Sequence, residues 1–116
     1  TAEALTLAQK IGLDLNTFKE VNAGTTANNG QFHINFLSKV LKNDIEPGFT
    51  IDLAHKDMGL AIETANSFRV GLPVGSSVQA VYGQARSGKF AKKDFSALLD
   101  YACELAEVDP PRIKKS

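Results

Sequence analysis

Apolar residues recur at intervals of three and four along most of the chain, which is the spacing of one face of an α-helix. No stretch alternates apolar and polar residues for long enough to predict a β-strand. We therefore expect an all-α fold, a multi-helix bundle in which about six helices turn their apolar faces toward one core.

Two short helices are predicted at the N-terminal end. The first stops at Gly12, because glycine commonly follows the last turn of a helix. The second starts after Asp14, whose carboxylate suits the N-cap position, and it stops near Gly24. The apolar positions that these helices are expected to bury are Leu5, Ala8, Ile11, Phe18 and Val21.

Two further helices are predicted in the middle of the chain. The polar residues 25–30 form a loop before the first of them, and residues 43–48 form a loop before the second. The second is the longest helix of the chain and runs from Thr50 to Phe68. The first helix is expected to bury Phe32, Phe36, Leu37, Val40 and Leu41. The apolar stripe of the second comprises Ile51, Ala54, Met58, Ala61, Ile62, Ala65 and Phe68.

Glycine and proline divide the C-terminal part into two more helices. Gly71 ends the long helix and Pro73 opens the next one, since proline is favoured in the first turn. A basic turn at residues 88–93 follows, and Asp94 is expected to cap a last helix that stops at Pro110-Pro111 before a loose lysine-rich tail. The inward positions of these helices are Val74, Val78, Val81 and Ala85, then Phe95, Leu98, Leu99, Ala102 and Leu105.

Composition and charge narrow the classes of function. The chain has 116 residues, and 13 basic residues balance 13 acidic ones, so no net field attracts nucleic acid or an anionic membrane. No apolar run approaches the roughly 20 residues that a membrane-spanning helix needs. The single cysteine, Cys103, allows no disulfide within the chain and suits a reducing, cytoplasmic setting. We expect no nucleic-acid or membrane partner.

One motif imitates a phosphate-binding loop. Residues 83–89 have its glycine and lysine spacing, but Phe90 stands where the loop needs a hydroxyl for magnesium, and no strand precedes the motif. We interpret it as the end of a helix. The basic residues beside it, Arg86, Lys89, Lys92 and Lys93, are interpreted as a solvated turn, with phosphate contact as the alternative.

Metal and nucleophile sites have weak support. His33 and His55 are far apart in the sequence, and neither has a cysteine or carboxylate nearby at ligand spacing, so we expect no metal site. Cys103 has no base placed beside it in the sequence, and we expect it to be a small buried residue.

The long helix carries the more informative surface. Asp52, Lys56, Gly59 and Glu63 share one of its faces. An Asp52–Lys56 ion pair is the simplest interpretation. However, glycine inside a helix costs about 1 kcal/mol relative to alanine. We therefore expect another helix or a ligand to approach Gly59 closely.

The same segment resembles the last signature motif of the β-hydroxyacid dehydrogenases, a family that includes 3-hydroxyisobutyrate dehydrogenase, tartronate semialdehyde reductase and glyoxylate/succinic semialdehyde reductase. The resemblance rests on residues 46–49 (Glu-Pro-Gly-Phe), on residues 52–61 (Asp-Leu-Ala-His-Lys-Asp-Met-Gly-Leu-Ala) and on residues 94–98 (Asp-Phe-Ser-Ala-Leu). It extends across essentially the whole chain, including residues 3–14, 22–24 and 71–74.

The resemblance implies a fold, a cofactor and three site residues. The family joins an N-terminal Rossmann domain to a helical domain with the fold of the 6-phosphogluconate dehydrogenase C-terminal domain, and it interconverts β-hydroxyacids and semialdehydes with NAD or NADP. By position, Lys56 resembles the lysine that contacts the cofactor near its nicotinamide. Phe49 and Asp57 resemble residues that shape the same cleft, although Asp57 in a purely structural role would orient Lys56 or bond to the backbone. The 6-phosphogluconate-type dehydrogenases themselves have a larger C-terminal domain, which argues against that enzyme.

Several parts of such an enzyme are missing from these 116 residues. The sequence has no dinucleotide-binding glycine fingerprint, no substrate-gripping Ser-Gly-Gly loop and no counterpart of the catalytic lysine, which the family places upstream of Thr1. The chain also begins without methionine, inside a predicted helix. We therefore expect residues 1–116 to be a single C-terminal domain that is inactive alone, holds no catalytic residue, works with its own Rossmann domain on a small β-hydroxyacid or semialdehyde, and forms homo-dimers or homo-tetramers. The alternative is a non-catalytic helical dimerisation or interaction module.

Overall fold

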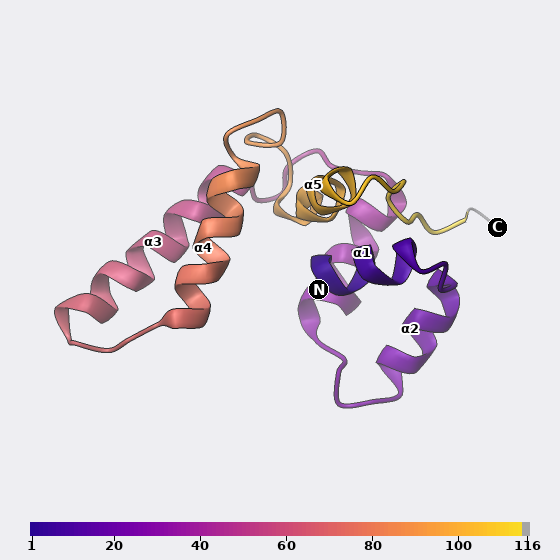
Figure 1. Cartoon of the computed structure of the whole chain (residues 1–116), viewed down its shortest axis with the longest axis horizontal. Coiled ribbons are helices and arrows are strands. Elements are labelled where there is room, and N and C mark those ends of the chain that lie inside the picture. Colours follow the sequence, from indigo (N-terminus) through magenta and orange to yellow (C-terminus); the bar gives the residue numbers. More distant parts are fainter. Residues whose placement is uncertain (115–116) are drawn as a thin grey trace. The chain divides into compact units, whose positions relative to one another are not determined.

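Helices form the fold in the computed structural model of the protein, which describes residues 1–114 (Figure 1). Within these residues there is no β-strand, and the one β-type pairing is an isolated antiparallel bridge between Thr50 and Asp94. The predicted all-α class is confirmed. The chain divides into two compact units, residues 1–45 together with the segment from Ser96 onward, and Glu46–Phe95.

The first unit begins with helix α1, Ala2–Lys10. It ends as predicted at Gly12, whose φ of 81° lies in the left-handed region that favours glycine. The backbone amide of Leu13 donates to the Ala8 carbonyl across 2.9 Å, which closes the helix end. Leu5 and Ala8 are buried, but Ile11 is 70% exposed, so its predicted place in the core is wrong.

Helix α2, Leu15–Ala23, starts where the sequence predicts, because Asp14 accepts a hydrogen bond from the Thr17 amide across 3.0 Å. No residue of this helix is fully buried. Phe18 packs edge-on against Phe32, with ring centroids 5.3 Å apart. Val21 is 60% exposed, which contradicts its predicted burial.

The third predicted helix is replaced by irregular helical turns. A π-helix, η1 (Gln31–Phe36), leads through a short helical stretch to a 3-10 helix, η2 (Val40–Lys42), and the two are separated by Lys39 at φ −120° and ψ −91°. The sequence contains no glycine or proline there, so its pattern predicts a regular helix. The apolar spacing nevertheless identified the buried side chains Phe32, Phe36, Val40 and Leu41.

Helix α5, Leu98–Leu105, packs against α1 in this unit. Thr6 Oγ1 lies 3.5 Å from Cys103 Sγ, and Lys10 Nζ donates to the Ala106 carbonyl across 2.7 Å. The N-cap of α5 is Ala97, which follows the short 3-10 helix η3 (Phe95–Ala97), and no side chain caps it. The prediction that Asp94 caps this helix is wrong, as is the predicted burial of Leu105, which is 67% exposed.

The segment after α5 is anchored. The amide of Ile113 donates to the Leu41 carbonyl across 2.7 Å, and Arg112 pairs with Asp100 across 2.8 Å. Pro111 before them is buried. The predicted loose tail is therefore wrong for Arg112 and Ile113, while residues 115–116 of that prediction lie outside the described residues.

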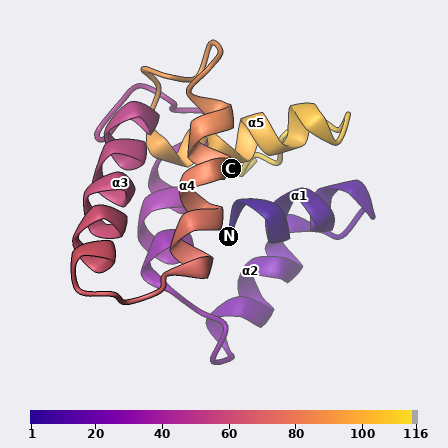
Figure 2. The same ribbon diagram turned by 60° about the vertical axis from the view of Figure 1, so that its left-hand side comes forward.

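The second unit is built on helices α3, Ile51–Ser67, and α4, Pro73–Ala85, which lie side by side in both views (Figures 1 and 2). Pro73 occupies the first turn of α4 as predicted. Their contact runs along glycines. A Cβ atom added at Gly59 would lie 3.0 Å from Gln79 Nε2, and one at Gly83 would lie 3.5 Å from His55 Nε2. The close approach expected at Gly59 is therefore made by another helix.

This glycine contact explains why the predicted apolar stripes are partly wrong. Phe68, Val74 and Val78 are 76%, 77% and 38% exposed, although the pattern predicts all three in the core. The faces that meet place glycines opposite Gln79, His55 and Met58, because glycine lets the helix backbones approach closely. The fully buried helix residues of this unit are Ile51, Ala54 and Ala85.

The two interhelical glycines should respond differently to alanine. We expect Gly83→Ala to raise the free energy of unfolding by up to about 1 kcal/mol, the gain in helix propensity, because the new methyl group makes only ordinary contact with His55. Gly59→Ala should gain less, since the amide of Gln79 must move away from a methyl group 3.0 Å distant. Urea denaturation of the protein and both variants measures this difference. Equal gains at the two positions would contradict the close Gln79 contact.

Candidate functional site

The segment before α3 is held by residues 94 and 95. Asp94 Oδ1 accepts hydrogen bonds from the amides of Gly48 and Phe49, at 3.0 and 3.2 Å. The Phe49 carbonyl accepts a bond from the Phe95 amide at 2.7 Å. The two phenyl rings also meet edge to face, with centroids 6.1 Å apart and planes at 74°. Phe49 is thus fixed through its backbone on both sides while 37% of it stays exposed.

The N-terminus of α3 is closed by protein groups. The amides of Ile51 and Asp52 donate to the carbonyls of Lys93 and Ala91, each across 3.0 Å. The next amide, that of Leu53, donates to Thr50 Oγ1 across 3.1 Å. The first amides of a helix are the usual anion-binding groups. Because these are occupied, the start of α3 offers no free cradle for phosphate.

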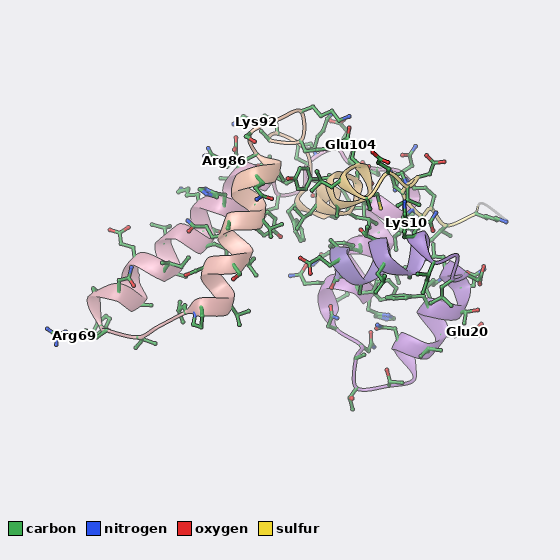
Figure 3. All side chains as sticks on the ribbon, viewed as in Figure 1. Lys10, Glu20, Arg69, Arg86, Lys92 and Glu104 are labelled. Carbon is green, nitrogen blue, oxygen red and sulfur yellow. The ribbon has the colours of Figure 1, made fainter. Side chains whose placement is uncertain are left out.

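Asp52 sits in the first turn of α3 and pairs with two cations. Its Oδ1 lies 2.8 Å from Arg86 Nε, and its Oδ2 lies 2.7 Å from Lys92 Nζ. Hydrogen bonds from Lys92 and Arg86 hold the pKa of the Asp52 carboxyl below its ordinary value. Arg86 and Lys92 lie together at one end of the helix pair, and Arg69 lies at the other end (Figure 3). The predicted Asp52–Lys56 pair is therefore wrong.

Lys56 and Asp57 lie on the exposed side of α3. Within residues 1–114 neither side chain takes part in a hydrogen bond or an ion pair. The structural role considered for Asp57, a bond to Lys56 or to the backbone, is therefore not seen in the described chain. Leu53 and Leu60, one turn before and one turn after them, are 42% and 52% exposed. This face of α3 presents a cation and a carboxylate between two leucines.

The basic turn is largely neutralised by carboxylates. Besides the two cations on Asp52, Lys93 Nζ lies 2.9 Å from Glu46 Oε1. Lys89 Nζ lies 5.2 Å from the centre of the Phe90 ring. Gly83 and Ala85 of the phosphate-loop imitation are helical residues of α4, in agreement with the sequence interpretation. These contacts favour a turn that stabilises the end of the helix pair.

The remaining candidates hold no ligand set. Among residues 1–114 no three His, Cys, Asp or Glu side chains gather as metal ligands, and His33 and His55 belong to different units. Cys103 is fully buried as expected, and burial raises the pKa of its thiol, so the reactive thiolate is disfavoured. No helix in the described part of the chain combines the length and apolar content required to cross a membrane.

Residues 1–102 match the family described as NAD-binding of NADP-dependent 3-hydroxyisobutyrate dehydrogenase. The chain belongs to this family. The resemblance found in the sequence is thereby confirmed, and the family is one of oxidoreductases that use a nicotinamide cofactor. The matched range contains Phe49, Lys56 and Asp57.

Relatives in this family share both sequence and fold with the chain. The 3-sulfolactaldehyde reductase of Escherichia coli K12 is 40% identical over 100 residues, which cover 86% of this chain and 34% of the relative. A 3-hydroxyisobutyrate dehydrogenase structure from Salmonella typhimurium superposes with a TM-score of 0.78 at 30% identity, covering 86% of this chain and 35% of that one. The 3-hydroxyisobutyrate dehydrogenase of Mycobacterium tuberculosis, solved with L-serine, gives 0.77 at 32% identity, with coverages of 86% and 36%. The chain therefore spans about a third of the length of these relatives.

Sequence reasoning did not find the part played by Asp94 in holding Phe49. The two residues are separated by 45 positions, and helical periodicity carries no information on contacts at that distance. The sequence indicates residues 94–95 as the start of the last helix and as part of the family motif, and neither reading predicts a bond to Phe49. The structure shows that the β-bridge between Thr50 and Asp94 brings the two segments together.

The ion pairs of Asp52 predict a pH dependence of stability. A carboxyl whose pKa is lowered by folding stabilises the fold above its unfolded pKa of about 3.9, and this contribution disappears as pH falls through the lower folded pKa. Asp52→Asn should therefore lower the melting temperature near neutral pH, and its difference from wild type should shrink as pH falls toward about 3. Glu63→Gln, an exposed neighbour on α3 outside these ion pairs, is the matched control and should show no such trend. A difference that stays constant over the acid range would exclude the ion pairs as its cause.

Proposed function

We propose that this chain is the C-terminal helical domain of an NAD(P)-dependent β-hydroxyacid dehydrogenase or semialdehyde reductase. Its membership of the family and the names of its relatives, which are dehydrogenases and reductases, support the proposal. One observation carries the proposal. The segment with the family signature contains both Lys56, whose side chain forms no hydrogen bond or ion pair within residues 1–114, and Phe49, which is fixed by hydrogen bonds and partly exposed.

The exposed residues suit the nicotinamide end of a cofactor. An ammonium group on a four-carbon stem can reach ribose or carboxamide oxygens from a helix and donate hydrogen bonds to them. We assign this part to Lys56, which no other group of residues 1–114 engages. Asp57 adds an acceptor on the same side of α3, and the exposed part of the Phe49 ring adds an apolar wall. The donor set therefore fits NAD or NADP at this end.

The pyrophosphate of the cofactor needs a second domain. The first amides of α3 are occupied by Lys93, Ala91 and Thr50, so this helix start has none to offer a phosphate. We propose that residues 1–116 act as one domain with the fold of the 6-phosphogluconate dehydrogenase C-terminal domain, behind a Rossmann domain of the same protein. That partner would supply the glycine-rich cradle and the catalytic lysine. The helical domain alone is then inactive.

The proposed reaction moves a hydride between the cofactor and the carbon that carries the hydroxyl group. The nicotinamide ring, when bound, supplies or accepts that hydride. Lys56 orients the ring by holding nearby oxygens, and the Phe49 side chain keeps water from the same wall of the cleft. Neither Lys56 nor Phe49 transfers the proton of the hydroxyl group, so Lys56 is a binding residue and not the general acid.

The relatives define the substrates to be compared. By their names they act on 3-sulfolactaldehyde, 3-hydroxyisobutyrate, 2-(hydroxymethyl)glutarate and L-threonate, all of them small acids or their aldehydes. L-Serine, present in one solved relative, is also a β-hydroxyacid. We propose a substrate of this class, and an enzyme that is a cytoplasmic homo-dimer or homo-tetramer.

The complete gene product should reduce NAD or NADP in the presence of at least one acid of this panel. Lys56→Ala should raise the KM for the cofactor about tenfold, the equivalent of one hydrogen bond to a charged donor, and should change kcat less. Initial rates with varied cofactor at saturating acid measure both constants.

Lys42→Ala is the matched control, because Lys42 is also exposed on a helical turn and its side chain has no bonding partner within residues 1–114. Its kinetics should equal those of wild type. An unchanged cofactor KM in Lys56→Ala would remove the assigned binding role. A folded gene product without turnover on any acid and either cofactor would favour the non-catalytic interaction module instead.

A further inference from the structure

Asp94 is a buried carboxylate outside the residues assigned to the cofactor. It is 2% exposed, and its Oδ1 accepts hydrogen bonds from the backbone amides of two successive residues, Gly48 and Phe49. Hydrogen bonds to a charged acceptor are stronger than those between neutral groups. Two adjacent amides directed at one oxygen fix the backbone torsions between them. The conformation of Gly48-Phe49 therefore depends on this carboxylate.

The next residue, Phe95, completes the hold on Phe49. Its amide donates to the Phe49 carbonyl across 2.7 Å, and its ring supports the Phe49 ring at its edge. Phe49 is thus restrained by residues 94–95 through its amide, its carbonyl and its ring, yet 37% of it is exposed. A side chain that is held so firmly and left partly uncovered loses little conformational entropy when a ligand covers it.

We propose that Asp94 is a positioning residue for the cofactor cleft, which sets the place of Phe49 before the cofactor binds. This inference rests on the proposed function of Phe49 and adds a residue that acts only through it. Asp94 itself is only 2% exposed, so we assign it no direct contact with cofactor or substrate.

A second carboxylate at the same end of α3 offers a comparison. Asp52 ties the first turn of α3 to Arg86 and Lys92 but makes no bond to residues 48–49. Loss of Asp52 therefore weakens the anchoring of the helix without releasing Phe49. A purely structural role for Asp94 would give the two substitutions the same consequences.

The test uses the complete enzyme and a double-mutant cycle. Asp94→Ala should raise the cofactor KM by about tenfold in the wild-type background, a loss comparable to that of one charged hydrogen bond. In the Phe49→Ala background the same substitution should change the cofactor KM by less than about twofold, because residues that act through one another are not additive. Asp52→Asn should lower the melting temperature and leave the cofactor KM unchanged.

Two further measurements keep the result interpretable. Asp94→Asn retains a carbonyl oxygen for the two amides, so its KM should lie between those of wild type and Asp94→Ala even if the alanine variant folds poorly. Amide hydrogen exchange of residues 48–49 should be slow in the wild-type enzyme and faster in Asp94→Ala, but not in Asp52→Asn. This readout does not depend on activity.

The outcomes separate the inference from the proposed function. An Asp94→Ala enzyme with a lower melting temperature but an unchanged cofactor KM overturns the inference, as does a KM increase of equal size in the Phe49→Ala background. In both cases wild-type turnover and the Lys56→Ala effect still support the proposed function. A wild-type enzyme without turnover overturns the proposed function and the inference with it.

Discussion

The second unit depends on how the start of α3 is joined to the turn that precedes α5. A helix begins with amides that have no partner inside it, and here backbone carbonyls of that turn and the Thr50 hydroxyl accept them. The Asp94 carboxylate extends the same junction to residues 48–49. Every feature of the candidate site is placed by this junction, because Phe49 stands immediately before it and Lys56 follows on the helix that it starts.

The contact between α3 and α4 is of a different kind. It relies on glycines that lie close to the side chains of Gln79, His55 and Met58. Such a contact depends on shape, and the room for an added methyl group differs between Gly59 and Gly83, whereas a contact made by leucines tolerates exchange of one apolar residue for another. Lys56 and Asp57, to which we assign the cofactor contact, are both exposed.

Local signals in the sequence predicted the ends of several helices well, but not the start of α5, and they predicted the buried faces less well. Asp14, Thr50, Gly12 and Pro73 act within a few residues of their own positions, so their effect on the helix ends can be read without tertiary structure. Burial depends on which neighbour a helix meets. Phe68 and Val74 have the spacing of an apolar stripe. However, α3 and α4 meet at Gly59 and Gly83, and both Phe68 and Val74 remain exposed. Of the candidate site, Lys56, Asp57 and Phe49 came from a local motif, whereas the bonds from Asp94 join positions far apart in the chain.

The burial of Cys103 has a practical consequence for following motion in the first unit. It is the only sulfhydryl group in these 116 residues, and its sulfur lies between α5 and Thr6 of α1. A thiol-reactive dye can reach this buried thiol only when the packing around it opens, and the raised pKa of the thiol makes reaction in the closed state slower still. The rate of labelling thus reports how often the packing around Cys103 opens.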